Sequence, residues 1–148
     1  MSSVKILNES KGKAMIRILL VDDQATVREG LKMRFALEPD LAVIGEAGNG
    51  MEALHAAHAL DPDVIVMDVE MPLMDGVTAA RHLQAVLPHI GIVMLSIHGD
   101  AETRAWAQEA GAATFVEKEG AVENLLDAIR WLHRVLVTLK IQDDAASA

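Results

Sequence analysis

Short unbroken runs of apolar residues alternate along the chain with segments whose apolar residues recur every three or four positions. The unbroken runs lie at residues 16–21, 41–46, 64–67, 91–95 and 114–116. A continuous apolar run of this length is typical of a strand buried on both faces of a parallel sheet. The pattern therefore predicts five short parallel strands.

The segments between and after these runs have helical periodicity, and they cover residues 25–37, 50–60, 76–87, 101–110 and 122–139. The apolar residues of the last segment fall on one stripe, at Val122, Leu125, Leu126, Ile129, Leu132, Leu136 and Leu139. Asp75 precedes Gly76 and is a plausible N-cap of the third helix. Strands and helices in alternation predict an α/β fold, a flavodoxin-like (βα)5 doubly wound parallel sheet with strand order 2-1-3-4-5.

The two ends of the chain lack this pattern. With 148 residues, the chain has the length of one ordinary domain. We expect a flexible extension over residues 1–14, a folded domain over 15–140 and a disordered tail over 141–148.

Composition and charge exclude several classes of function. The chain has 13 Lys and Arg against 22 Asp and Glu, a net charge of −9 that disfavours binding to nucleic acid. It contains no cysteine, which excludes disulfides and thiolate metal sites. No apolar run is long enough to span a membrane, and no signal peptide is evident. We therefore expect a cytoplasmic protein that binds neither nucleic acid nor membranes.

Polar residues gather at the carboxyl ends of the predicted strands. Asp22 and Asp23 follow the first strand, Asp68 the third and Ser96 the fourth, and Lys118 lies two residues beyond the fifth. Ligands of open α/β sheets bind at this edge, where the strand order reverses. In the order 2-1-3-4-5 the first and third strands are neighbours, so the three carboxylates should converge.

Three clustered carboxylates repel one another unless their pKa values rise or a cation neutralises them. Oxygen ligands with room for water suit Mg²⁺, and Mn²⁺ is also possible. Lys118 and Ser96 could contact a phosphoryl group, and a carboxylate can attack phosphorus to give an acyl phosphate. Each residue alone has an ordinary structural explanation, as a helix cap, a loop residue or a surface charge, but their combination indicates a phosphoryl site.

Two weaker patterns have simpler explanations. Gly45, Gly48 and Gly50 are spaced G-x-x-G-x-G, which is not the order of a dinucleotide-binding loop, and we interpret them as turn glycines. His55 and His58 lie one helical turn apart without an evident third metal ligand, so exposed helix histidines are the better interpretation.

Six stretches together resemble the receiver domain of bacterial two-component response regulators, and their residues are most similar to those of the NarL/LuxR type. They are Ile-Leu-Leu-Val-Asp-Asp (18–23), Val-Arg-Glu-Gly-Leu (27–31), Gly-Glu-Ala-Gly-Asn-Gly (45–50), Pro-Asp-Val-Ile-Val-Met-Asp (62–68), Met-Pro-Leu-Met-Asp-Gly (71–76) and Gly-Ala-Ala-Thr-Phe-Val-Glu-Lys (111–118). The resemblance implies that Asp68 is the phosphoacceptor. It also implies metal binding by Asp22, Asp23, Asp68 and the backbone carbonyl of Glu70.

The resemblance further implies that Lys118 bridges to the phosphoryl oxygens and that Ser96 and Phe115 are switch residues. The donor would be a sensor histidine kinase or a phosphotransfer protein. The output surface would comprise the helix at 101–110, the last strand and the last helix, and it could form a homodimer. The domain would be a signalling module with only self-catalysed phosphorylation and dephosphorylation, and not an enzyme.

This chain departs from the family pattern in three respects. NarL/LuxR-type proteins carry a helix-turn-helix after the receiver, so the chain is either a stand-alone receiver or a truncated one. Glu119 follows Lys118 where many receivers have a cis proline. A cis peptide bond before a residue other than proline is costly, so the resemblance does not predict the conformation of this loop. Phe115 has no hydroxyl, so any switching by it must be steric.

Other residues near the expected site and surface have two interpretations each. Glu70 and His98 could influence attack of water on the phosphoryl group or could simply face solvent. Trp106 and Trp131 could anchor an interface or could cover the edge of the core.

Two other functions stay open. An aspartyl-nucleophile phosphatase would need a second carboxylate two residues after Asp22, where this chain has Gln24. An interaction module that does not depend on phosphorylation would keep the fold without using the site.

Overall fold

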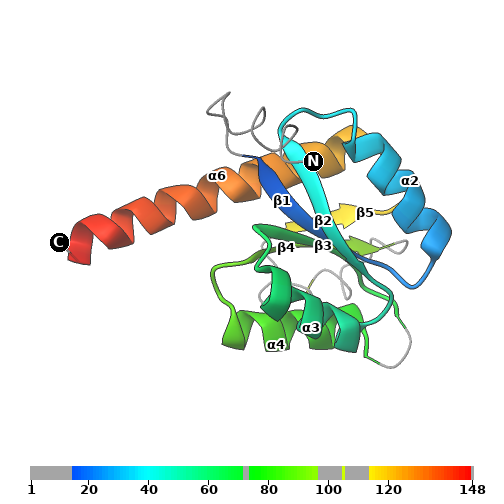
Figure 1. Ribbon diagram of the computed structural model, residues 1–148, viewed down its shortest axis with the longest axis horizontal. Helices are drawn as coiled ribbons and strands as arrows, with labels where there is room; N and C mark the ends of the chain where they lie inside the picture. The colour runs from blue at the N-terminus through cyan, green and yellow to red at the C-terminus, as the bar shows by residue number, and fades with distance from the viewer. Residues whose placement is uncertain (1–14, 72–73, 97–104, 106–113, 148) are drawn as a thin grey trace, which may run out of the picture.

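A five-stranded parallel sheet forms the centre of the computed structural model, which describes residues 15–71, 74–96, 105 and 114–147 (Figure 1). Its strands are β1 (Ile16–Val21), β2 (Leu41–Ala47), β3 (Val64–Asp68), β4 (Gly91–Ser96) and β5 (Thr114–Glu117). Their order is β2-β1-β3-β4-β5, and all four neighbouring pairs are parallel. The predicted fold class and strand order are therefore confirmed.

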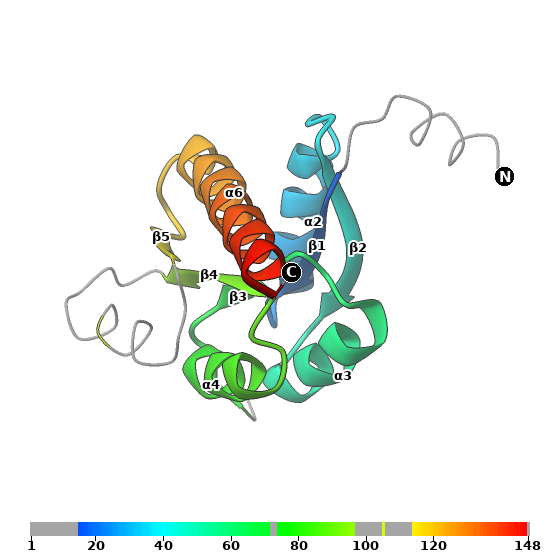
Figure 2. The ribbon, with the colours of Figure 1, turned by 90° about the vertical axis from the view of Figure 1, so that its left-hand side faces the viewer.

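Helices cover both faces of this sheet (Figures 1 and 2). One layer contains α2 (Ala25–Phe35) and α6 (Val122–Ser147), and the other contains α3 (Gly50–Leu60) and α4 (Gly76–Val86). Successive residues of a strand point to opposite faces, so Leu19 packs in the core beneath α3 and α4 while Leu20 packs in the core beneath α6. Burial on both faces is why the strands are unbroken apolar runs.

Side-chain caps fix where two helices begin. The side chain of Asn49 accepts a hydrogen bond from the backbone N–H of Glu52 at the start of α3. The side chain of Asp75 accepts one from the N–H of Thr78 at the start of α4, as predicted for this residue. These caps satisfy backbone donors that the first turn of a helix leaves unpaired.

The last helix is longer than the sequence pattern predicted. It continues to Ser147, whereas residues 141–148 were expected to form a disordered tail. The added turns contain Lys140, Gln142 and two alanines, which favour helix without needing an apolar face. In Figure 1 this carboxyl-terminal half of α6 projects beyond the sheet.

Smaller differences concern single residues and segments. Gly45 lies inside β2 and not in a turn. A β-carbon at this position would lie 2.5 Å from the side chain of Leu60, which is why a small residue fits there. The expected extension over 1–14 and the expected helix at 101–110, apart from Ala105, lie outside the described residues. Among the described residues, no helix combines the length and the apolarity that crossing a bilayer requires.

Candidate functional site

Three carboxylates meet at the carboxyl edge of the sheet. Asp22 directly follows β1, and Asp68 is the last residue of the neighbouring β3. One oxygen from each of Asp22, Asp23 and Asp68 lies within 4.8 Å of the others. Asp22 and Asp68 are buried and Asp23 is exposed, so the cluster opens to solvent on one side. The predicted convergence of these three residues is confirmed.

Lys118 provides a positive charge inside this cluster. Its Nζ lies 2.7 Å from Oδ2 of Asp22 and 3.2 Å from Oδ2 of Asp68. The backbone N–H of Lys118 donates to the carbonyl of Ser96 at 2.8 Å, which fixes the loop after β5 beside the end of β4. All described peptide bonds are trans, including the one before Glu119.

Backbone amides orient the two buried carboxylates. Oδ1 of Asp22 accepts a hydrogen bond from the N–H of Gln24 at 2.9 Å. Oδ1 of Asp68 accepts one from the N–H of Glu70 at 3.2 Å. In both residues Oδ1 is held by the backbone and Oδ2 faces Lys118, so the carboxylates are fixed before any ligand arrives.

The electrostatics of the cluster reflect competition between burial and charge. Burial is the main cause that raises the pKa of Asp68, and the negative charge of Asp22 adds to the rise. Lys118 and the backbone amide of Glu70 oppose it. Burial alone would lower the pKa of Lys118, but its hydrogen bond to Asp22 and the charges of both carboxylates outweigh burial and raise it. The lysine is therefore held charged, and among the described residues it is the one cationic side chain that pairs with carboxylates of this cluster.

The donor set fits a hard divalent cation. Three carboxylates offer only oxygen, and the exposed position of Asp23 leaves room for water, which such ions retain. One lysine does not neutralise three negative charges, so a divalent ion would remove the remaining repulsion. The site can therefore bind a divalent metal.

The two expected switch residues lie on the strands next to this cluster. Ser96 is the buried last residue of β4, and Asp68 pairs with its neighbour Leu95 in the β3–β4 register. Phe115 lies on β5 and is partly buried against the core beneath α3 and α4. Their switching roles stay predictions, and so does metal binding by the carbonyl of Glu70.

Arg28 is a contributor to the site that the sequence analysis did not single out. Its guanidinium donates to the backbone carbonyl of Asp22. Its Nε also pairs with Oε1 of Glu46 at 3.0 Å. Arg28 and Glu46 both belong to stretches that carried the family resemblance, so pairing the unexplained polar residues of those stretches could have identified them.

Gly76 is a second such contributor. A β-carbon at Gly76 would lie within 2.2 Å of the backbone carbonyl oxygen of Asp68. The absence of a side chain therefore lets α4 begin directly against the end of β3. Gly76 was recognised only as the start of a helix, because a close approach between distant segments leaves no local periodicity in a sequence.

The remaining residues singled out in the sequence have three different outcomes. His55 and His58 are both exposed on α3, as expected for surface histidines. Trp131 is 48% exposed on α6. His98 and Trp106 lie outside the described residues.

Comparison with known proteins agrees with this geometry. Residues 18–130 match the family described as the response regulator receiver domain. The chain belongs to this family. It is thus a signalling domain of the kind found in two-component systems, and receiver domains interact with histidine kinases.

The relatives of this receiver domain have more than one architecture. It is 36% identical over 119 residues to the transcriptional regulatory protein LnrK of Bacillus subtilis, a match that covers 80% of this chain and 54% of LnrK. It is 38% identical over 132 residues to a protein-glutamate methylesterase/protein-glutamine glutaminase of Methanosarcina mazei, covering 82% of this chain and 36% of that protein. The response regulator domain of Thermotoga maritima CheB superposes with a TM-score of 0.76 at 34% identity, covering 81% of this chain and 97% of that structure.

These matches limit what can be carried over to this chain. The receiver domain spans about half the length, or less, of these two curated relatives. The expectation that it binds no nucleic acid cannot be extended to a longer protein, because several relatives are named transcriptional regulators. The narrower NarL/LuxR assignment stays a prediction, since methylesterases are also among the relatives.

Proposed function

We propose that this receiver domain accepts a phosphoryl group on Asp68 in a Mg²⁺-dependent reaction and passes the signal on by changing its surface. The observation that carries the proposal is the placement of Lys118 between Asp22 and Asp68 in a cluster of three carboxylates. A single aspartate at a strand end would be an ordinary helix cap or loop residue. A fixed ammonium beside a buried carboxylate and two further carboxylates is suited to phosphoryl transfer.

The proposed transfer is a substitution at phosphorus. The donor is the phosphohistidine of a sensor kinase or of a phosphotransfer protein. Oδ2 of Asp68, which faces the lysine, forms a bond to phosphorus while the bond from phosphorus to the donor's imidazole nitrogen breaks. The electron pair returns to that nitrogen, which takes up a proton, and Asp68 is left as an acyl phosphate.

The surrounding residues have separate roles in this proposal. A divalent ion held by Asp22, Asp23, Asp68 and the carbonyl of Glu70 would supply positive charge for the phosphoryl oxygens. The ammonium of Lys118 can leave Oδ2 of Asp68 for a phosphoryl oxygen while it keeps its contact with Asp22. The N–H of Glu70 holds the other oxygen of Asp68, which keeps the acyl group oriented.

The signal would then reach the output surface through Ser96 and Phe115. Ser96 would move toward the phosphoryl group and Phe115 would repack, which biases a pre-existing equilibrium at β5 and α6. A homodimer through this face, NarL/LuxR-type output and a cytoplasmic location belong to the same proposal. They are supported by family membership alone.

Intact mass spectrometry after incubation with acetyl phosphate tests the proposal. The wild-type chain should gain one phosphoryl group with Mg²⁺ and none with a chelator. Asp68→Asn should gain none, whereas Asp127→Asn, at an exposed position of α6, should behave as wild type. Labelling without Mg²⁺, or equal labelling of Asp68→Asn, would contradict the proposal. No labelling at all would favour an interaction module, and turnover of a phosphate ester would favour a phosphatase.

A further inference from the structure

The carboxyl-terminal half of α6 extends past the sheet with every side chain in solvent. Residues 137–147 are all exposed, and this part of the helix projects from the domain in Figure 1. A helix segment of this length whose side chains are all exposed is only marginally stable in water. It also exposes two apolar β-branched residues that disfavour an isolated helix, Val137 at 43% and Ile141 at 62%. A surface that covers these residues would stabilise the projecting turns.

One face of this projecting segment is complementary to itself. Arg134, Val137, Ile141 and Asp144 are spaced by three, four and three residues, so they lie along one stripe of the helix. All four are exposed. The stripe has a basic end, an apolar centre and an acidic end, and it is symmetric about the midpoint between Val137 and Ile141.

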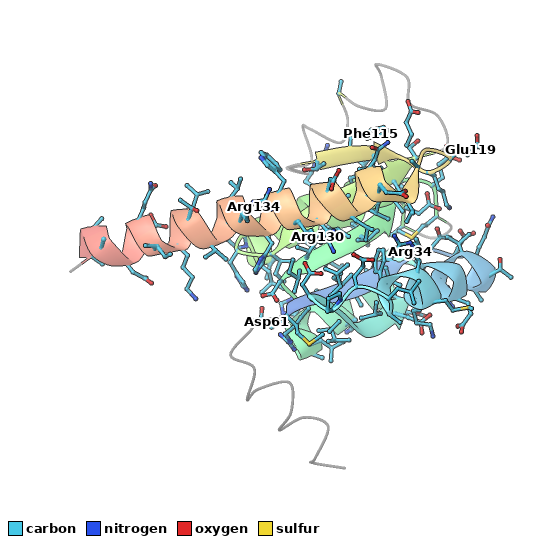
Figure 3. All side chains as sticks on the ribbon, turned by 90° about the horizontal axis from the view of Figure 1, so that it is seen from above. Arg34, Asp61, Phe115, Glu119, Arg130 and Arg134 are labelled. Atoms are coloured by element: carbon cyan, nitrogen blue, oxygen red, sulfur yellow. The ribbon has the colours of Figure 1, made fainter. Side chains whose placement is uncertain are left out.

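The apolar contacts that hold α6 on the sheet lie on a different side of the helix from this stripe. Leu132 and Leu136 bind α6 to the sheet core from a different side of the helix. Leu139 continues that side past the end of the core, and Leu139 lines a hollow there together with Asp61 and Pro62 of the domain. Val137 lies at the edge of the stripe nearest this hollow and also lines it. In Figure 3, Arg134 lies farther along the projecting helix than Arg130, which pairs with Glu38 and Asp40 of the domain.

We infer that the projecting half of α6 pairs antiparallel with the same segment of a second copy of this chain. A two-fold axis at the centre of the stripe places Val137 opposite Ile141 of the second copy. The same axis places Arg134 opposite Asp144 of the second copy, so each pair of helices gains two ion pairs. A parallel pair would instead bring each charged residue against its own like charge.

Sedimentation of the full chain at low ionic strength tests this pairing. Small interfaces associate weakly, so the concentration should range from about 5 to about 500 µM. We expect a monomer–dimer equilibrium that Val137→Gln and Ile141→Gln each weaken by about tenfold or more. Leu139→Gln is the matched control, since Leu139 is 51% exposed in the same turns but faces another side. It should leave the dissociation constant unchanged.

Charge reversal then tests the antiparallel register. Arg134→Glu and Asp144→Arg should each weaken the dimer, because each places like charges opposite one another. The double variant should restore it, because the pairs are regenerated with exchanged signs. A chain that stays monomeric throughout the range, loss of the dimer in Leu139→Gln but not in Ile141→Gln, or a double variant that is not restored would each overturn the inference.

Discussion

At the scale of single residues, Asp22, Asp23 and Asp68 carry more negative charge than Lys118 alone can balance. Asp22 and Asp68 both contact Lys118, while Asp23 is exposed at the mouth of the cluster. Like charges at this distance oppose folding unless a cation joins them. The stability of the domain should therefore report directly on metal binding.

Removing one of the three charges should stabilise the metal-free protein. We expect Asp23→Asn to raise the free energy of unfolding by roughly 1 kcal/mol in a chelator, the size of one charge–charge contact in a partly wet site. The same substitution should reduce the stabilisation that Mg²⁺ gives to the wild type, because one ligand is lost. Urea unfolding with and without Mg²⁺ measures both effects. An unchanged response to Mg²⁺ would show that Asp23 is not a ligand.

Arg28 should matter more than its neighbour Lys32, although both pair with Glu46. Only Arg28 also donates to the carbonyl of Asp22, and its side chain is the less exposed, at 19% against 34%. Arg28→Gln should cost about 1–2 kcal/mol of unfolding free energy. Lys32→Gln should cost about 0.5 kcal/mol or less, as is usual for a surface pair. Equal losses in urea unfolding would contradict a role for Arg28 in holding the loop after β1.

At the scale of elements, the strands and most helix ends follow from the periodicity of apolar residues and from capping residues. β1 and α3 have the predicted bounds, because a strand buried on both faces and a helix with a good N-cap are both local patterns. The end of α6 was predicted wrongly, because the core-facing apolar stripe ends at Leu139 and most residues beyond it are polar or small, so periodicity does not mark these turns as helix. Gly45 was also misassigned to a turn, because its close approach to Leu60 of the following helix is a contact between separate elements that glycine spacing does not reveal.

The junction of β3 and α4 gives a prediction about packing. Gly76→Ala should destabilise the domain by about 1–3 kcal/mol, because the new methyl group meets the carbonyl of Asp68. Gly30→Ala is the matched control, since nothing lies within 4 Å of its β-carbon position in α2. It should stabilise by about 0.5–1 kcal/mol, the usual gain for alanine over glycine in a helix. If both substitutions stabilised the domain, the close contact at Gly76 would be disproved.

The contact between α6 and the loop before β2 predicts a dependence of stability on pH. Glu38, in the loop before β2, accepts hydrogen bonds from Arg34 and from Arg130 of α6. Both hydrogen bonds lower the pKa of Glu38, and that from Arg34 has the larger effect. This stabilisation is complete above the unfolded pKa, which is about 4.3, and is lost as the pH falls through the lower folded pKa. In urea unfolding from pH 7 to pH 3, Glu38→Gln and Arg130→Gln should both lose less stability than the wild type. A wild-type slope in Glu38→Gln would contradict this linkage.

At the scale of the whole molecule, the site exists because of strand order. Asp22 and Asp68 are far apart in the sequence, but β1 and β3 are neighbours, so their ends meet. The convergence of the acidic residues could be predicted because each follows a recognisable strand. The pairing of Arg28 with Glu46 and the approach of Gly76 to Asp68 could not, because each depends on how separate elements pack.

The most direct test of the central claim is the location of the phosphoryl group. After incubation with acetyl phosphate and Mg²⁺, borohydride reduction converts a phosphorylated aspartate to homoserine, which peptide mass spectrometry can assign to one position. We predict homoserine at position 68 alone, and only in samples that contained Mg²⁺. Homoserine at another aspartate, or at position 68 regardless of Mg²⁺, would contradict the account of the three carboxylates and Lys118 as a metal-dependent phosphoryl site.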